Sequence, residues 1–332
     1  MKRVREAGSE PTDRRTIPVI GDSKVIVGRG LLDAIPSEIT SKNSGIKASK
    51  YVIVSDTNVW PLYGPGLVES FKALGGFTVL GCGHEPKETG DQLYDGRLLL
   101  CYQVPAGENS KSRGVKAAIE DFMLMHRCNR DTCMLALGGG VVGDLVGYVA
   151  ATFMRGVPVI QIPTSSTAMI DSSVGGKTAI NVPAGKNLIG AFHQPTIVYA
   201  DMECLATLGR RELVEGVAEA IKMGVIRLPS LFDLLEANVE KVLGLEPTII
   251  AQVMYDSIRG KAEVVAEDER EAGLRSTLNW GHTIGHAIEA IKSPAMMHGE
   301  CVAAGCVAEA ELALRLALDS NQASAPLHAL LI

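Results

Sequence analysis

Short apolar runs alternate with longer stretches of helical periodicity through the first two-thirds of the chain. The apolar runs are bounded by polar and turn-forming residues, which predicts buried strands. These predicted strands are Lys24–Val27, Tyr51–Val54, Thr132–Leu137 and Pro158–Ile162. Between them, Gly114–Met125 has the apolar spacing of an amphipathic helix. This alternation is typical of parallel α/β organisation.

The pattern changes from about Thr207 onward, where helical periodicity replaces the apolar runs. The predicted helices are Arg211–Gly224, Ser230–Leu243, Thr248–Glu267, Thr277–Ile291 and Gly299–Leu318. We therefore predict an α/β domain over residues 1–205 and an all-helical domain over residues 206–332.

Two regions depart from this organisation. Residues 75–100 contain many turn formers and little periodicity, so we expect an insertion there. Residues 319–332 leave the helical pattern without a stop signal. We therefore expect the helical domain to be incomplete, as in a chain truncated at its C-terminus.

Composition narrows the class of protein. Of the 332 residues, 46% are apolar and 21% are charged, which is typical of a globular protein with a substantial core. The net charge of −6 argues against general binding of nucleic acid. No apolar run is long enough to span a membrane, because Asp144 and Arg155 interrupt the longest one. The seven cysteines lie mostly in apolar segments and the N-terminus has no apolar signal core, so we expect a cytoplasmic protein with reduced thiols.

Three histidines near the C-terminus are the strongest candidates for chemistry. His282 and His286 are four residues apart, which places both rings on one face of a helix. Arg275 and Asn279 extend the same predicted face, and His298 follows. A face this polar costs too much to bury for packing alone, and neutral imidazole is the commonest metal ligand. A solvated helix face with incidental histidines remains the alternative.

A glycine-rich turn follows the predicted strand 132–137. Gly138, Gly140 and Gly143 form a G-x-G-x-x-G pattern, which lets a backbone approach a pyrophosphate at a helix N-terminus. The motif alone is weak, and it lies later than the first βαβ unit, where a Rossmann domain carries it. Asp56, at the end of the strand 51–55, is a candidate for binding a ribose or, alternatively, a simple turn residue.

The segment Asp171–Thr178 is not a P-loop, because Asp171 stands where that motif requires glycine. ATP hydrolysis is therefore excluded. The segment still offers Lys177, hydroxyl groups and exposed amides, and Lys186 and Asn187 lie close in sequence. These donors suit a phosphate-bearing ligand.

The predicted helix from Arg211 has apolar residues on one face and Glu215, Glu219 and Lys222 on another. The polar face is either a solvated face with an ion pair or part of a metal site. In the second case Glu219 would complete a site of two histidines and one carboxylate with an open position. His282 and His298 would be its histidines and His286 would face the substrate, a division that the spacing does not decide.

Several long segments resemble the 3-dehydroquinate synthase family, in the order that the family has them. They are GGGVVGDLVGYVAATFMRGV, DSSVGGKTAINVPAGKNLIGAFHQP, ELVEGVAEAIKMG, KAEVVAEDEREAGLR and NWGHTIGHAIE followed by HGECVAAG. The resemblance covers roughly residues 17–315, apart from 75–100. Within the family, the chain resembles the first domain of the pentafunctional shikimate-pathway enzyme of fungi.

The resemblance implies a Rossmann-like NAD-binding domain followed by an all-α metal-binding domain. The implied activity is that of a carbon–oxygen lyase that converts 3-deoxy-D-arabino-heptulosonate 7-phosphate to 3-dehydroquinate and phosphate, on the route to chorismate and the aromatic amino acids. In the family, NAD transiently oxidises the substrate, phosphate is eliminated, the hydride returns and an intramolecular aldol reaction closes the ring. One zinc ion per subunit acts as Lewis acid.

The resemblance also implies roles for individual residues. The implied zinc ligands are Glu219, His282 and His298. The implied NAD positions are Asp56, Asn58, Glu108, Lys111, Gly139, Gly140, Asp144, Thr164, Ser165, Lys186 and Thr207. The implied substrate positions are Arg155, Asp171, Lys177, Asn187, Lys222, Lys261, Arg275, Asn279, His286 and His298. The implied catalytic residues are Glu271, His286, Lys222 and Asn279. Arg155 matches a position that reaches into the neighbouring subunit's site, which implies a homodimer.

Three alternatives remain at this point. The first is another NAD- and zinc-dependent sugar phosphate cyclase, against which Arg275 and Asn279 argue because a carboxylate-bearing substrate needs them. The second is a metal-dependent polyol dehydrogenase, which would not need four cationic side chains around one anion. The third is an inactive truncated paralogue, supported only by the expected loss of a C-terminal stretch that carries a further phosphate contact. Losing one charge-assisted contact costs about 1.5–3 kcal/mol.

Overall fold

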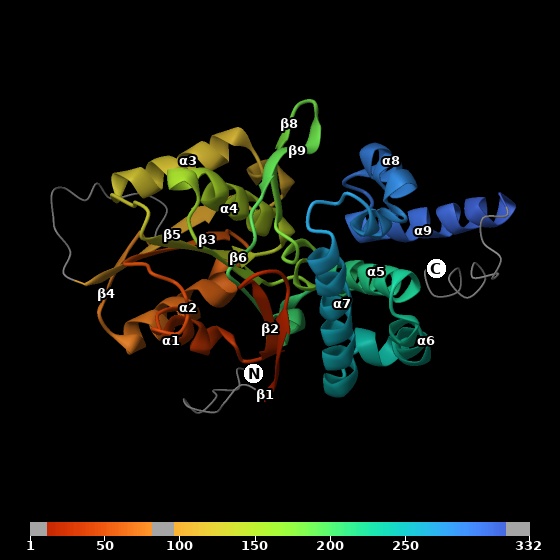
Figure 1. Ribbon diagram of the computed structural model, residues 1–332, viewed down its shortest axis with the longest axis horizontal. Helices are drawn as coiled ribbons and strands as arrows, with labels where there is room; N and C mark the ends of the chain where they lie inside the picture. Colours follow the sequence, from red (N-terminus) through yellow and green to blue (C-terminus); the bar gives the residue numbers. More distant parts are fainter. Residues whose placement is uncertain (1–11, 82–95, 317–332) are drawn as a thin grey trace.

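The computed structural model describes residues 12–81 and 96–316, and its centre is an eight-stranded sheet (Figure 1). The strand order is β1-β2-β10-β7-β6-β3-β5-β4, and every neighbouring pair is parallel except β1 and β2. The strands are β1 Thr12–Pro18, β2 Lys24–Arg29, β3 Lys50–Asp56, β4 Phe77–Leu80, β5 Arg97–Val104, β6 Thr132–Gly138, β7 Val159–Pro163 and β10 Ile197–Asp201.

Helices cover both faces of this sheet, as Figure 1 shows. Helices α1 (Ile35–Ile39) and α2 (Trp60–Leu74) lie on one face, and α3 (Arg113–Met125) and α4 (Gly140–Thr152) lie on the other. Strand β3 is apolar toward both layers, because Ile53 packs in the α1–α2 cluster and Val52 in the α3–α4 cluster. Strands buried on both faces read as continuous apolar runs, which is why the sequence predicts them.

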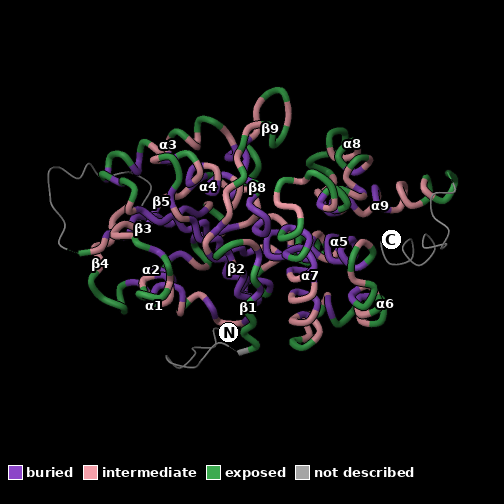
Figure 2. Tube along the Cα trace, in the orientation of Figure 1, coloured by how far each residue is buried: buried purple, intermediate pink, exposed green. Residues whose placement is uncertain are grey.

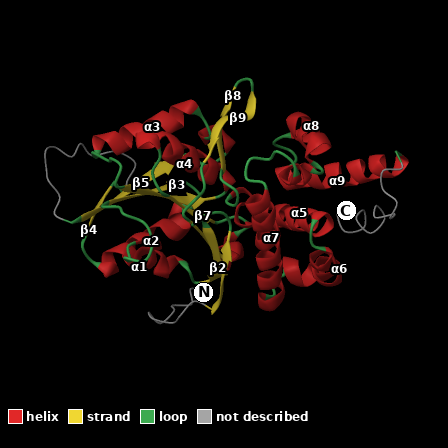
Figure 3. Cartoon of the chain, viewed as in Figure 1, coloured by secondary structure: helices red, strands yellow, loops and turns green. Residues whose placement is uncertain are grey.

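The residues after β10 form a helical part, in which Figure 3 shows helices and loops. Its helices are α5 Arg210–Ile226, α6 Pro229–Leu243, α7 Pro247–Glu267, α8 His282–Lys292 and α9 His298–Arg315. A two-stranded antiparallel hairpin, β8 (Lys177–Val182) and β9 (Gly185–Phe192), projects beside it from the α/β part (Figure 1). The predicted class, a Rossmann-like α/β part followed by a helical part, is confirmed.

One hydrophobic cluster joins the two parts. It contains Val25 and Val27 of β2 and Val198 of β10, together with buried residues of α5, α6 and α7 such as Ile221 and Ile258. Figure 2 shows this buried band running from the sheet into α5. Because the cluster is shared, the sheet edge and the helices support one another, and the division near residue 205 remains a prediction.

Two sequence predictions about elements are wrong. Thr277–Ile291 is not one helix: a 3-10 segment η6 (Leu274–Asn279) precedes α8, and Gly281 between them has a left-handed φ of 79°. Arg275 and Asn279 therefore do not lie on the helical face of His282. Residues 75–100 are not simply an insertion, because β4 and β5 belong to the sheet. The rest of that stretch, 82–95, and the expected incomplete end at 317–332 lie outside the described residues.

The described helices include none with the length and apolar character that a membrane crossing requires.

A candidate metal and cofactor site

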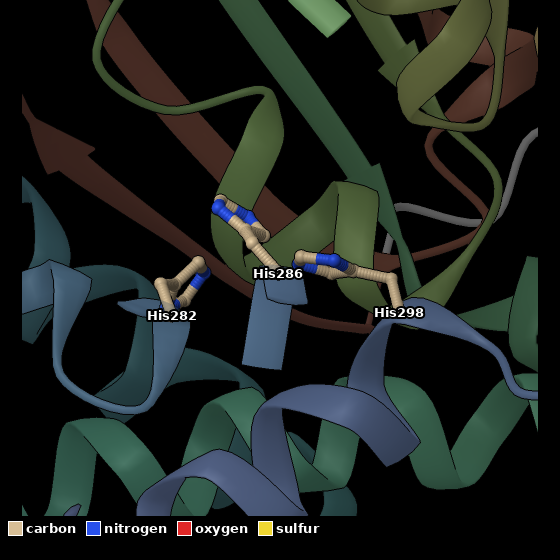
Figure 4. Close-up of side chains that lie close together, drawn as sticks. All are labelled: His282, His286 and His298. Atoms are coloured by element: carbon tan, nitrogen blue, oxygen red, sulfur yellow. The ribbon is translucent and has the colours of Figure 1, made fainter. Parts of the chain in front are cut away.

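Helices α8 and α9 bring three histidines together. The nitrogen atoms of His282, His286 and His298 that could bind a metal all lie within 4.8 Å of one another. Figure 4 shows His298, at the start of α9, pointing toward the two rings that α8 carries. The spacing of four residues does place His282 and His286 on one face, as predicted, because α8 begins at His282.

Glu219 of α5 lies beneath these rings and is almost fully buried. Its Oε1 atom is 3.9 Å from the Nε2 atom of His282 and 3.9 Å from that of His298, and it has no hydrogen-bond partner among the described residues. Ligands bound at about 2.0–2.1 Å to a tetrahedral metal lie roughly 3.4 Å apart. The three side chains therefore need only a small contraction to hold a divalent cation.

The other ring nitrogens are already engaged, which leaves both Nε2 atoms free. The Nδ1 atom of His282 lies 3.2 Å from the carbonyl oxygen of Trp280, and that of His298 lies 3.1 Å from Oε2 of Glu289. Such contacts to the second nitrogen fix the ring orientation of metal-binding histidines. Burial lowers the pKa of His282, and Lys222 lowers it further. Burial would also lower the pKa of His298, but Glu289 and Glu219 outweigh it and raise that pKa.

Buried cations border the cluster on the side of the sheet. The ammonium group of Lys222 is ion-paired with Oε2 of Glu219, and both side chains are at most 3% exposed. Lys261 of α7 donates to the carbonyl oxygen of Asp171 at 2.5 Å and is ion-paired with its carboxylate. Burial would raise the pKa of Asp171, but the charges of Lys261 and Lys222 outweigh it and lower that pKa. Burial lowers the pKa of Lys261 itself.

Arg275 is 1% exposed and lies under the glycine pair that precedes β8. Its guanidinium donates to the carbonyl oxygens of Glu269 and of Gly175, the latter at 2.9 Å. Its Nε atom has no partner among the described residues. A Cβ atom added to Gly175 would lie 2.5 Å from Nη2 of Arg275, so only glycine permits this contact.

A second group of polar side chains lies where the hairpin meets the loop after α7. Lys177 at the start of β8 is paired with Glu271 at 2.6 Å, and Asn279 donates to the other carboxylate oxygen at 2.8 Å. Burial would raise the pKa of Glu271, but these two donors outweigh it and lower that pKa. Glu271 therefore remains a carboxylate at neutral pH.

The carboxyl ends of β3, β6 and β7 meet at one edge of the sheet. Ser55 pairs with Leu137, and Gly138 pairs with Pro163, so Asp56, the glycine turn and Thr164 are neighbours. Helix α4 begins in the glycine turn without a side-chain cap. A nucleotide binds in such a crevice of an open parallel sheet, with its phosphates at a helix N-terminus.

Comparison with known proteins decides the family. The sequence model of the 3-dehydroquinate synthase N-terminal domain matches residues 101–215, and that of the C-terminal domain matches residues 216–331. The chain belongs to the 3-dehydroquinate synthase family. It is also 45% identical, over 91% of its length, to the pentafunctional AROM polypeptide of Candida tropicalis.

The curated relatives are much longer than this chain, and the solved relatives confirm its fold. The chain spans about a fifth of the length of the curated relatives that it matches. A 2-deoxy-scyllo-inosose synthase, solved with carbaglucose-6-phosphate, NAD+ and Co2+, is 24% identical, with a TM-score of 0.82 over 96% of this chain and 81% of that one. The 2-epi-5-epi-valiolone synthase of Streptomyces hygroscopicus, solved with NAD+ and Zn2+, is 25% identical, with a TM-score of 0.76 over 100% of this chain and 82% of that one.

The remaining positions that the family resemblance implies for NAD lie on several elements. Lys111 is paired with Asp144 at 2.5 Å, and burial raises the pKa of Asp144 despite this pair. Glu108 accepts a hydrogen bond from Asn181 of the hairpin. Asn58 and Ser165 follow β3 and β7, and Gly139 and Gly140 lie in the turn that begins α4. Lys186 points to α8, and Thr207 hydrogen-bonds to Tyr63 at 2.5 Å.

Three positions stay predictions with little support from contacts. Asp56 accepts the backbone N–H groups of Asn58 and Val59, which is the turn role that the sequence left open. Asn187 is exposed on β9 with a φ of 57°. Arg155 is exposed after α4, also at positive φ, and its contact with a neighbouring subunit is untested.

Sequence reasoning missed two carboxylates that position α8. Glu309 of α9 accepts the backbone N–H groups of Gly281 at 2.7 Å and of Ile284 at 3.1 Å. Glu289 accepts from His298 and from Lys186, and these two donors hold its pKa at about 2 although burial opposes them. Glu289 is seven residues after His282, on the same helical face, so its spacing was a usable signal.

Proposed function

We propose that the chain is a 3-dehydroquinate synthase that converts 3-deoxy-D-arabino-heptulosonate 7-phosphate to 3-dehydroquinate and inorganic phosphate. The observation that carries the proposal is the carboxylate of Glu219, which is buried and faces the free Nε2 atoms of His282 and His298. Family membership supplies the substrate, and the cationic groups beside this site suit a substrate with a carboxylate and a phosphate.

Glu219, His282 and His298 would hold one zinc ion, and the crevice after β3, β6 and β7 would hold NAD. The donor set of two imidazoles and a carboxylate fits a zinc ion with an open position. When bound, NAD supplies the transient oxidation that acidifies the substrate, and zinc polarises the oxygen at that centre. Two of the solved relatives contain NAD+ and a divalent metal, which is Co2+ in one structure and Zn2+ in the other.

The protein's own residues would bind and orient the anionic ends of the substrate. Lys177 and Asn187, on the hairpin, would take the phosphate. Arg275, whose buried Nε atom has no partner among the described residues, would bind the carboxylate. Glu271 would move a proton near the entrance, and Asn279, which donates a hydrogen bond to it, would hold its carboxylate in place. Burial lowers the pKa of His286, which keeps its ring neutral at pH 7 and able to accept a proton.

We also propose that the enzyme is a cytoplasmic homodimer in which Arg155 reaches the neighbouring site. Five of the described cysteines, Cys128, Cys133, Cys204, Cys301 and Cys306, are buried free thiols, which supports a reducing compartment. Arg155 is exposed at the end of α4, where a partner could be reached.

The test is release of inorganic phosphate from 3-deoxy-D-arabino-heptulosonate 7-phosphate by the purified chain. We expect release that needs NAD and stops when a chelator removes the metal. Glucose 6-phosphate, which has no carboxylate, is the matched control and should release none. Release from glucose 6-phosphate alone would favour another sugar phosphate cyclase. No release from either substrate, by a folded chain that binds NAD, would reject the synthase activity.

A further inference from the structure

Glu289 of α8 is a single carboxylate that accepts hydrogen bonds from two side chains in different parts of the fold. Its Oε2 atom lies 3.1 Å from Nδ1 of His298, at the start of α9. Its Oε1 atom lies 2.7 Å from Nζ of Lys186, on β9 of the hairpin. The side chain of Glu289 is 14% exposed, whereas that of Lys186 is 50% exposed.

The contact with His298 decides which ring nitrogen is free. A carboxylate only accepts hydrogen bonds, so Nδ1 of His298 must carry a proton, and in the neutral ring the lone pair that can bind a metal is then on Nε2. That Nε2 atom faces Glu219. Glu289 therefore holds His298 in the tautomer and orientation that a metal ligand needs.

The contact with Lys186 reaches across to the hairpin. Among the described residues, two ion pairs join the hairpin to the helical part: Lys186 with Glu289 and Lys177 with Glu271. Figure 1 shows the hairpin standing apart from the sheet and facing α8. Leu188 on β9 is 62% exposed, so little apolar packing adds to these two contacts there.

We propose that Glu289 is a positioning residue that orients His298 for the metal and, through Lys186, couples metal binding to docking of the hairpin on α8. The proposal rests on the metal site of the proposed function. A cation on Nε2 of His298 makes the Nδ1–H group a stronger donor, which fixes the carboxylate. A fixed carboxylate is a better organised partner for Lys186. By linkage, docking of the hairpin must favour metal binding by the same factor.

The first experiment measures the affinity for Co2+ and Zn2+ by competition with a chromophoric chelator. We expect Glu289→Gln to weaken metal binding about 10- to 100-fold, the usual effect of losing such an outer carboxylate. The visible spectrum of the bound Co2+ should also shift, because His298 loses its fixed orientation. The control is Glu311→Gln, which removes an exposed ion pair with Arg315 on the helix that carries His298. A Glu289→Gln protein with the affinity and spectrum of the control would overturn the positioning role.

The second experiment measures hydrogen exchange of the hairpin amides with and without Zn2+. In the unaltered chain we expect zinc to slow exchange in residues 177–192. Lys186→Met should abolish that zinc-dependent protection while weakening zinc binding by no more than about threefold, as expected for a modest coupling. Unchanged protection in Lys186→Met would overturn the coupling, and this variant also serves if Glu289→Gln does not fold.

These measurements use the metal alone and no substrate, so they are independent of the assay for phosphate release. A chain that shows the expected metal and exchange effects but releases no phosphate would keep this inference and reject the synthase activity. A chain that releases phosphate while its Glu289→Gln variant binds metal normally would support the synthase activity and reject this inference.

Discussion

A buried lysine is tolerated only where an opposite charge compensates for its lost hydration. Lys222 is 3% exposed and its compensation comes from Glu219 and Asp171. Burial would lower the pKa of Lys222, but these two carboxylates outweigh it and raise that pKa. Glu219 in turn offers its other oxygen to the histidines. The pair is therefore both a structural element and part of the candidate metal site.

We predict that Lys222→Met destabilises the metal-free protein by about 3–5 kcal/mol, because Glu219 is left buried without its partner. Zinc should restore much of the loss, since a bound cation neutralises the same carboxylate. The measurement is urea unfolding with a chelator and with zinc. Arg315→Met, which removes an exposed pair with Glu311, is the control and should change stability by less than about 0.5 kcal/mol. An equal loss with and without zinc would contradict the prediction.

The candidate site could be predicted in part at this scale. The residue types and spacing of His282, His286 and Glu219 indicated a metal site, and the structure brings these side chains together. Spacing could not show that Glu219 is buried, nor which ring nitrogen of each histidine is free. The free nitrogen of His282 depends on a contact with Trp280 in the turn before α8, and that of His298 on a contact with Glu289 that the packing of α8 on α9 creates.

At the scale of elements, apolar periodicity predicted strands β2, β3, β6 and β7 and helices α3, α5, α6, α7 and α9 within a few residues, but it missed the buried strands β5 and β10. It failed at residues 274–292, where a polar stripe suggested one continuous helix. The chain instead turns at Gly281, whose left-handed backbone ends η6 and sets the start of α8. A side-chain pattern does not report such a turn, because the cause is a backbone conformation that glycine alone adopts readily.

We predict that Gly281→Ala destabilises the protein by at least about 2 kcal/mol. Alanine is strained at a φ of 79°, and its Cβ atom would lie 2.3 Å from Sγ of Cys306. Since His282 follows directly, metal affinity should fall as well. Gly66→Ala on α2 is the control: its Cβ atom meets nothing within 4 Å, so stability should be unchanged or higher by about 1 kcal/mol. Unfolding midpoints and a zinc titration measure both effects. A Gly281→Ala protein that matches the control would contradict the view that residue 281 must be glycine.

At the scale of the whole molecule, the shared core argues that the two parts are one cooperative unit. Strands β2 and β10 at one side of the sheet and helices α5, α6 and α7 bury their side chains in the same cluster. Neither part can lose this cluster without exposing apolar surface of the other. Ligands at the sheet edge and between α5, α8 and α9 should therefore stabilise the whole chain, although each touches a different region.

The two tryptophans of the chain allow this to be tested, because one lies in each part. Trp60 begins α2 on the sheet, and Trp280 packs against the shared core just before α8. We predict that Trp60→Phe and Trp280→Phe proteins each unfold in urea with one fluorescence midpoint that equals the midpoint of their own far-UV circular dichroism. Zinc at a hundredfold excess over its dissociation constant should raise the free energy of unfolding by about 2.7 kcal/mol, and both urea midpoints should therefore move upward together. If Trp280 reported an earlier transition than circular dichroism, the helical part would unfold by itself, and the shared cluster would not bind the two parts into one unit.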